Sequence, residues 1–189
     1  MGLIYICGII SKHKEMKTAV IYASKHGTTG FVAQKIKNLL TDDEVVMFNL
    51  ERQERIDLRP FGRIIIGSPL YTGTSLPVVR KFIEQNLLDL LQKEVGIFVC
   101  CMFHDKAEKQ IIKGFPELLR NHARSITNMG GEYRFEDMNC IERLVVKKIS
   151  GATGSVSEIN FRNIDLFVRK LTADASQPCH TESDSFVKL

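Results

Sequence analysis

The sequence contains no tryptophan, no strong excess of one charge and no apolar run long enough to cross a membrane. Lysine and arginine number 26 against 22 aspartate and glutamate residues, which gives a net charge of +4. This excess is too small to indicate nucleic-acid binding, although it favours anionic partners or anionic membrane surfaces. The apolar opening, residues 1–10, is about half the length of a spanning helix, and it lacks the basic region and cleavage site of a secretory signal. We therefore expect no integral membrane segment.

The cysteines form no recognisable framework. Cys7, Cys100, Cys101, Cys140 and Cys179 are odd in number, and none stands at a spacing typical of a metal site or redox pair. Cys100 and Cys101 lie together in an apolar run, where free cysteine usually acts as a small buried hydrophobe. These features predict a reduced, cytoplasmic protein without metal ligands.

The chain length indicates a single domain, because 189 residues match the usual size of one hydrophobic core. We expect this domain at residues 17–173. Residues 1–16 are predicted to be an N-terminal leader, and the sequence leaves open whether its apolar opening is an extra strand, a disordered segment or an artefact of the start site. Residues 174–189 are polar and aperiodic, which predicts a disordered tail.

Short apolar runs alternate with longer amphipathic runs. Residues 18–23, for example, are apolar throughout, as in a strand buried on both faces. Helix 31–40 has an apolar stripe of Phe31, Val32, Ile36, Leu39 and Leu40. The predicted strands are 18–23, 44–50, 63–70, 94–103 and 132–139, and the predicted helices are 31–40, 76–91, 106–126 with a break near Gly114 and Pro116, 141–151 and 161–171. Five strands alternating with helices predict an α/β fold whose parallel sheet is covered on both faces.

A polar loop, "SKHGTT", connects the first predicted strand to the first predicted helix. A helix N-terminus presents unpaired backbone N–H groups and the positive end of the helix dipole, and both attract phosphate. A glycine lets the backbone approach an anion, and hydroxyl side chains add donors. An ordinary capped turn would have a similar spacing, so the loop alone leaves both interpretations open. The candidate anion-binding residues are Ser24, Lys25, His26, Gly27, Thr28 and Thr29.

A second loop, "SPLYTG", follows the third predicted strand and precedes a helix that Ser75 is expected to cap, with Pro77 in its first turn. Ligands of doubly wound sheets bind beyond the carboxyl ends of the strands, where the strand order reverses. If the order is 2-1-3-4-5, strands one and three are neighbours and their loops meet. The apolar and aromatic members of this loop suit a flat ring. The candidate residues are Ser68, Pro69, Leu70, Tyr71, Thr72 and Gly73.

A third loop, after the fourth strand, supplies Met102, Phe103 and His104 as candidates for the other face of such a ring. Met102 and Phe103 also suit a core or rim position, and His104 also suits solvent. No paired carboxylates and no Ser/His/Asp constellation are evident, so we predict no dedicated catalytic acid or base.

These loops resemble those of the flavodoxin family, whose phosphate loop reads [ST]-x-T-G-x-T. Ser24, Gly27 and Thr29 match this pattern, whereas His26 stands where a hydroxyl residue is usual. "GSPLYTGTSLPVVRKFIEQN" resembles the second flavin loop of the family and its following helix. The resemblance covers about Lys17 to Leu171. It implies a three-layer, doubly wound five-stranded sheet of order 2-1-3-4-5 and FMN as the cofactor.

A narrower resemblance links the stretch 143–171 to the ending of the flavodoxin-like protoporphyrinogen dehydrogenases, which pass electrons to a quinone. The long insertion that marks those enzymes after strand four is not evident here. Helix 141–151 has an apolar stripe that suits either packing on the sheet or contact with a membrane or quinone.

Three functional hypotheses follow. The first is an FMN-binding redox protein that transfers electrons to a partner protein or a quinone. The second is a flavin-dependent protoporphyrinogen dehydrogenase with a quinone acceptor and peripheral membrane contact. The third is a non-redox, partner-binding module that has lost FMN, which only His26 suggests.

Overall fold

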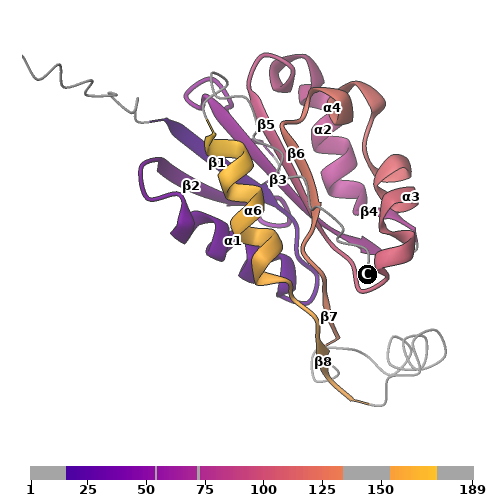
Figure 1. The fold of residues 1–189 in the computed structure, drawn as a ribbon. Helices are drawn as coiled ribbons and strands as arrows, with labels where there is room; N and C mark the ends of the chain where they lie inside the picture. Colours follow the sequence, from indigo (N-terminus) through magenta and orange to yellow (C-terminus); the bar gives the residue numbers. More distant parts are fainter. Residues whose placement is uncertain (1–15, 54, 72, 134–153, 174–189) are drawn as a thin grey trace, which may run out of the picture.

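The computed structural model describes residues 16–53, 55–71, 73–133 and 154–173. They form a sheet with helices on both faces, so the molecule has three layers (Figure 1). The strands are β1 (Lys17–Tyr22), β2 (Glu44–Asn49), β3 (Arg63–Tyr71), β4 (Thr74–Ser75), β5 (Glu94–Cys100), β6 (Ser125–Asn128), β7 (Glu132–Tyr133) and β8 (Val156–Ser157). The helices are α1 (Thr28–Leu39), α2 (Pro77–Leu90), α3 (His104–Gly114), α4 (Glu117–His122) and α6 (Phe161–Thr172).

The main sheet has the order β2-β1-β3-β5-β6, with β4 added as a short antiparallel partner of β3. All neighbours along this order pair in parallel. Counted by its parallel strands alone, the sheet therefore has the predicted order 2-1-3-4-5. β7 and β8 form a separate antiparallel ribbon that projects beyond the sheet (Figure 1).

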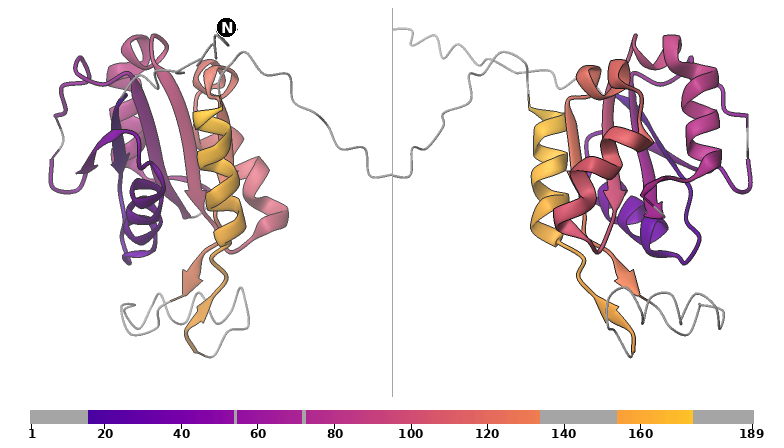
Figure 2. Two further views of the ribbon diagram at one scale, coloured as in Figure 1. Left: turned by 60° about the vertical axis from the view of Figure 1, so that its left-hand side comes forward. Right: turned by 90° about the vertical axis from the view of Figure 1, so that its right-hand side faces the viewer.

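Two apolar clusters hold the layers together. Val20, Ile65 and Phe98 point to one face of the sheet, where they pack against α1 and α6. Their strand neighbours, such as Ile21 and Ile66, point to the other face and pack against α2 and the segment of α3 and α4. Figure 2 shows α6 and α2 on opposite sides of the sheet. The central strands are buried on both faces, as their continuous apolar runs predict.

The predicted position of the fifth parallel strand is wrong. That strand is β6 and not 132–139, and its first two residues, Ser125 and Ile126, fall at the end of the predicted helix 106–126. Among the described strands, β6 pairs only with β5 and is therefore an edge strand. An edge strand tolerates polar residues, and the polar sequence Ser-Ile-Thr-Asn does not have the pattern of a buried strand. Glu132 and Tyr133 belong instead to the β7–β8 ribbon. Residues 134–139 and the predicted helix 141–151 lie outside the described residues, as do nearly all of the predicted leader and the whole predicted tail.

Two details of the helices also differ from the prediction. α1 begins at Thr28, and its buried side is centred on Val32 and Ile36, so that Phe31 and Leu39 are exposed. Phe31 instead meets the exposed ring of Phe161 edge to face, with centroids 6.5 Å apart. At α2 the N-cap is Leu76, because the preceding serine pairs in β4. Among the described helices, none combines the length and apolar character that a membrane crossing requires.

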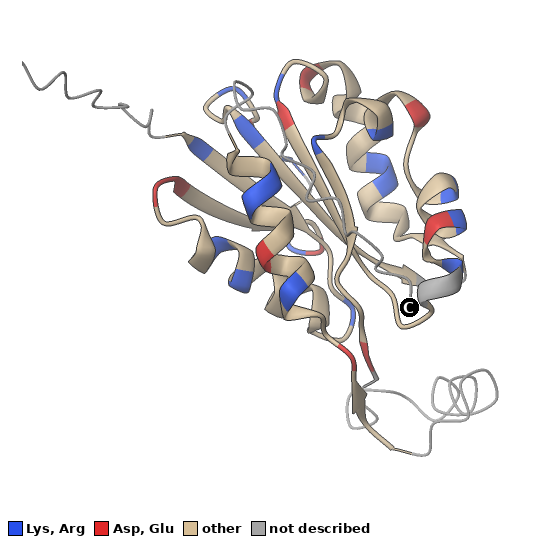
Figure 3. Cartoon of the chain, in the orientation of Figure 1, with Lys and Arg blue, Asp and Glu red and all other residues tan. Residues whose placement is uncertain are grey.

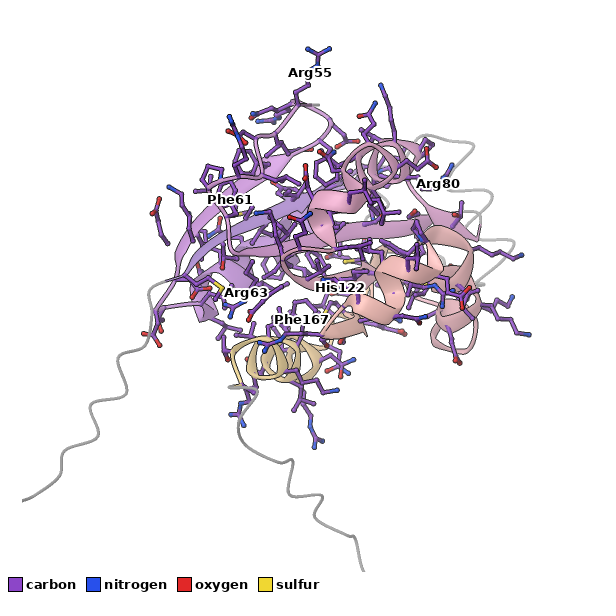
Figure 4. The ribbon with its side chains drawn as sticks, turned by 90° about the horizontal axis from the view of Figure 1, so that it is seen from above. Arg55, Phe61, Arg63, Arg80, His122 and Phe167 are labelled. Carbon is purple, nitrogen blue, oxygen red and sulfur yellow. The ribbon has the colours of Figure 1, made fainter. Side chains whose placement is uncertain are left out.

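An ionic network around the buried side chain of Arg63 stabilises the amino edge of the sheet. The guanidinium of Arg63, which is 5% exposed, donates to Asp43 at 2.5 Å, to Glu94 at 3.1 Å and to the Leu171 carbonyl at 3.2 Å. Arg124 donates to the same carbonyl at 3.1 Å. Positive charge at the C-terminal end of α6 complements its dipole. Figure 4 shows Arg63 at this edge beside α6, which carries Phe167.

We expect Arg63→Met to destabilise the fold by about 3 kcal/mol, because it leaves the Asp43 carboxylate, whose side chain is 10% exposed, without its cation. Glu94 keeps its ion pair with Arg124. Chemical denaturation followed by circular dichroism measures this change. Arg59→Met is the matched control, because Arg59 pairs with Asp57 at the surface. Exposed pairs contribute little to stability, so the control should lose much less. Equal losses would show that the buried network does not fasten this edge.

Candidate functional site

Three loops leave neighbouring strands at the carboxyl edge of the sheet. Tyr22 at the end of β1 pairs with Gly67, and Pro69 farther along β3 pairs with Cys100 at the end of β5. β1 is followed by the loop 23–27, β3 by the turn at Gly73, and β5 by residues 101–103. β1 and β3 flank the point where the strand order reverses, which is where doubly wound proteins bind ligands. The structure therefore brings the three predicted segments to one edge of the sheet.

The first loop is shaped by its own backbone. Gly27 is the N-cap residue of α1 and has φ 86°, a left-handed conformation that favours glycine. The Gly30 N–H donates to the Ser24 hydroxyl at 3.2 Å, which closes the loop over the first turn of the helix. Helix geometry leaves the N–H groups of Thr28 and Thr29 without intrahelical acceptors. The loop thus directs backbone donors to one place. Lys25 is exposed and His26 is half-buried beside them.

An acidic side chain that the sequence patterns did not single out lies on this loop. The Ser24 N–H donates to Glu51 Oε2 at 3.2 Å. Glu51 follows β2, and its own N–H donates to Asn49 Oδ1 at 3.0 Å in a local turn. No spacing rule links residues 24 and 51, because their proximity comes from the pairing of β1 with β2.

Beneath the loop lies a buried thiol. Thr29 is 1% exposed and its hydroxyl hydrogen-bonds Cys100, which is 6% exposed. Burial raises the pKa of the Cys100 thiol to about 12, while the bond to Thr29 opposes this shift. Burial also raises the pKa of Cys101. Both thiols are free and protonated at neutral pH, as the prediction of small buried hydrophobes requires.

The second loop is a hairpin of β3 and β4 that is anchored on three sides. The Ser68 hydroxyl donates to the Pro69 carbonyl at 2.9 Å and accepts from the Leu76 N–H at 3.1 Å. The Ser75 hydroxyl donates to the Gly114 carbonyl at 2.7 Å. From α2, the guanidinium of Arg80 donates to the Ser75 carbonyl and, at 3.3 Å, to the Thr74 hydroxyl.

These contacts divide the predicted residues of the hairpin. Ser68, Pro69 and Leu70 are buried, and Leu70 packs into the core on the α2 side. Tyr71 ends β3, and Gly73 lies in the turn with φ 90°. Thr72 lies outside the described residues. The buried members attach the hairpin to the fold. Their predicted contacts with a cofactor remain predictions.

The third loop is fixed from the neighbouring strand β6. Asn128, which sequence reasoning did not select, accepts from the Cys101 N–H and donates to the Cys101 carbonyl, each at 3.1 Å. The side-chain amide of Asn128 thereby makes the two hydrogen bonds that the backbone of a paired strand residue would make. Met102 and Phe103 are half-buried, and Phe103 packs on the α2-side core with Lys106 Nζ 5.5 Å from its ring centroid. His104 is the first residue of α3.

The described residues contain no cluster of three or more histidine, cysteine or acidic side chains that could hold a metal ion. α1 carries no acidic residue (Figure 3), and its basic residues, Lys35 and Lys37, lie toward its C-terminal end, away from the first loop. The site is therefore built from backbone donors, hydroxyls and a few exposed charges. This arrangement suits the binding of an anionic group.

These features define a doubly wound α/β protein with an anion-type loop at its switch point. A family model described as a flavodoxin domain matches residues 19–160, and the chain belongs to this family. The predicted family and fold are thereby confirmed, whereas the narrower resemblance to protoporphyrinogen dehydrogenases stays a prediction. No curated protein matches the chain.

Solved structures of the same fold share little sequence with the chain. It is similar to rubredoxin oxygen:oxidoreductase from Desulfovibrio gigas, with 14% identity and a TM-score of 0.53 over 82% of this chain, but it spans only 35% of that longer chain. It is also similar to a flavodoxin, WrbA-like protein from Agrobacterium tumefaciens, with 16% identity and a TM-score of 0.50 over 83% of this chain and 92% of the other. An NADH:FMN oxidoreductase in its apo form matches with 9% identity and a TM-score of 0.54 over 82% and 88%.

We expect Gly130→Ala to destabilise the protein more than Gly73→Ala. Both glycines have positive φ, so each substitution brings the left-handed penalty of about 1–2 kcal/mol. A Cβ on Gly130 would lie 1.9 Å from the Glu158 carbonyl oxygen, whereas a Cβ on Gly73 meets nothing within 4 Å. Guanidinium denaturation of both variants measures the difference. Equal losses of stability in the two variants would mean that the loop between β6 and β7 rearranges around the new Cβ without a cost in free energy.

We expect Cys100 to reduce stability at alkaline pH. The unfolded thiol ionises near its ordinary pKa of 9.0 and the folded thiol only near 12, so stability that is complete below pH 9 is lost as the pH rises toward 12. Between about pH 8 and about pH 10.5, the wild type should lose about 2 kcal/mol more than Cys100→Ala. Urea denaturation at both pH values measures this, and Cys101 is common to both proteins. Parallel pH profiles would contradict a buried, neutral thiol.

Proposed function

We propose that this chain binds FMN and transfers electrons through it. The observation that carries this proposal is the pairing of β1 with β3, which sets the 24–29 loop beside the 68–75 hairpin at the switch point. The FMN phosphate binds at the 24–29 loop and the flavin ring lies toward the tip of the hairpin and residues 102–104. This is the ligand position of a doubly wound fold.

The residues present suit the phosphate. The left-handed Gly27 and the first turn of α1 supply backbone N–H groups, and Ser24 and Thr28 supply hydroxyls. The Thr29 hydroxyl, predicted from the sequence as a further donor, instead bonds Cys100 in the interior. The loop already takes one anionic oxygen, since Ser24 N–H donates to the Glu51 carboxylate. This contact supports an anion-binding loop independently of the motif.

The flavin supplies the redox chemistry when it is bound, and the protein binds, orients and shields it. The chain's own contribution is to hold the phosphate at α1 and to fix the loops around the ring through Ser68, Arg80 and Asn128. The electron acceptor in this proposal is a redox partner protein or a quinone, and the location is cytoplasmic. Two functions compete with this proposal. One is the oxidation of a porphyrinogen with a quinone as acceptor, and the other is a partner-binding module that has lost FMN.

Titration with FMN tests the proposal. Binding should quench flavin fluorescence, and the bound flavin should undergo reversible reduction by dithionite. Ser24→Ala should weaken FMN binding by about 1–3 kcal/mol, because it removes a hydroxyl from the loop and the acceptor of the Gly30 N–H. Thr41→Ala is the matched control, since Thr41 lies just beyond the other end of α1 and bonds only Asp42 in the described contacts.

Each outcome has a defined meaning. Wild-type protein that leaves FMN fluorescence and absorbance unchanged would contradict the proposal and favour the module without FMN. Equal FMN affinity of Ser24→Ala and the wild type would place the phosphate elsewhere. Oxidation of a porphyrinogen by the FMN-loaded protein with menaquinone would favour the dehydrogenase.

A further inference from the structure

We infer that Glu51 is an internal anion that competes with the FMN phosphate for the 24–29 loop and so limits the preference for phosphorylated over unphosphorylated flavin. The inference rests on the proposed function, because it concerns the same site. It assigns a specificity-determining role to a residue outside the motif.

The position of Glu51 is fixed by its neighbours. The Leu50 N–H donates to the Tyr22 carbonyl at 2.8 Å, and Leu50 is 1% exposed in the core. Asn49 accepts from the Glu51 N–H through its side chain, and from the Arg52 and Gln53 N–H groups at 3.0 Å through its carbonyl. The backbone at residue 51 is therefore held at the carboxyl edge, where its side chain reaches the Ser24 N–H.

A phosphate and this carboxylate cannot use the loop equally well together. An N–H group that points at Glu51 Oε2 has to turn to a phosphate oxygen or be shared between two acceptors. The two groups also carry charges of the same sign at short range, which raises the free energy of the complex. The contact is exposed, so solvent screening makes the penalty modest rather than prohibitive.

Competition has a distinct consequence for ligand choice. A flavin without phosphate brings no charge to the loop and does not need to displace Glu51. A phosphorylated flavin gains the donors of the loop but must overcome the carboxylate. Glu51 therefore lowers the affinity for FMN and leaves the affinity for riboflavin unaltered. The result is a cofactor that exchanges more readily than the loop alone would allow.

Glu51→Gln tests this inference, because glutamine keeps the shape and an acceptor oxygen but removes the charge. We expect FMN to bind about 3- to 10-fold more tightly to the variant and riboflavin to bind equally to both proteins. Fluorescence titration measures both ligands. Glu44→Gln is the matched control, because Glu44 lies at the other end of β2, where it pairs with Lys17 at the surface. Its FMN affinity should match that of the wild type.

Three results would overturn the inference. For a protein that binds FMN, they are an unchanged FMN affinity in Glu51→Gln, a weaker FMN affinity, or the same change for riboflavin as for FMN. Inorganic phosphate, titrated against the amide NMR signals of Ser24 and Gly27 without flavin, separates this inference from the proposed function. If the protein does not bind FMN but Glu51→Gln binds phosphate more tightly than the wild type, the role of Glu51 at the loop is supported. Only the proposal that the ligand is a flavin then fails.

Discussion

The parallel pairing of β1 with β3 is the constraint on which the candidate site depends. In this register, Tyr22 ends its strand opposite Gly67, while β3 continues to Tyr71 before it turns. The chain leaves β1 toward α1 on one face and leaves the hairpin toward α2 on the other. Two loops that start side by side therefore diverge, and a slip of the register by one residue would separate the donors of one loop from the tip of the other.

The two edges of the sheet serve different purposes. At the amino edge, Arg63 is buried, multiply bonded and joined to the end of α6. At the carboxyl edge, Ser24 and Glu51 are joined by one exposed hydrogen bond of 3.2 Å. Strong interactions at one edge fix the order of the layers, so the loops at the other edge do not have to stabilise the fold. An exposed acidic side chain can therefore remain on the proposed phosphate loop, because Glu51 disfavours ligand binding there and does not destabilise the fold.

The sequence predicted those elements of the fold that depend on buried apolar runs or on glycine-rich turns. The strands at the centre of the sheet are apolar throughout, and the loop around Gly27 follows a family pattern, so both were identified. β6 was missed because an edge strand needs little apolar character. Asn128 and Glu51 were missed for another reason, since each acts on a residue 27 positions away. Such contacts exist only after the strands have paired, and no local pattern encodes them.

The first loop differs in electrostatic character between its buried side, at Thr29 and Cys100, and its exposed side, at Lys25 and Glu51. Beneath it, Thr29 meets a neutral thiol, because burial keeps Cys100 protonated. Among the described residues, the buried cation is Arg63, which lies at the opposite edge of the sheet, so the backbone donors of α1 act over an uncharged interior. The charges that distinguish one ligand from another therefore lie at the exposed rim, on Lys25 and Glu51. Surface charges can be exchanged at little cost in stability, whereas a buried charge would need a compensating partner. A loop built this way keeps its shape fixed by glycine and the helix, while single surface substitutions adjust its affinity.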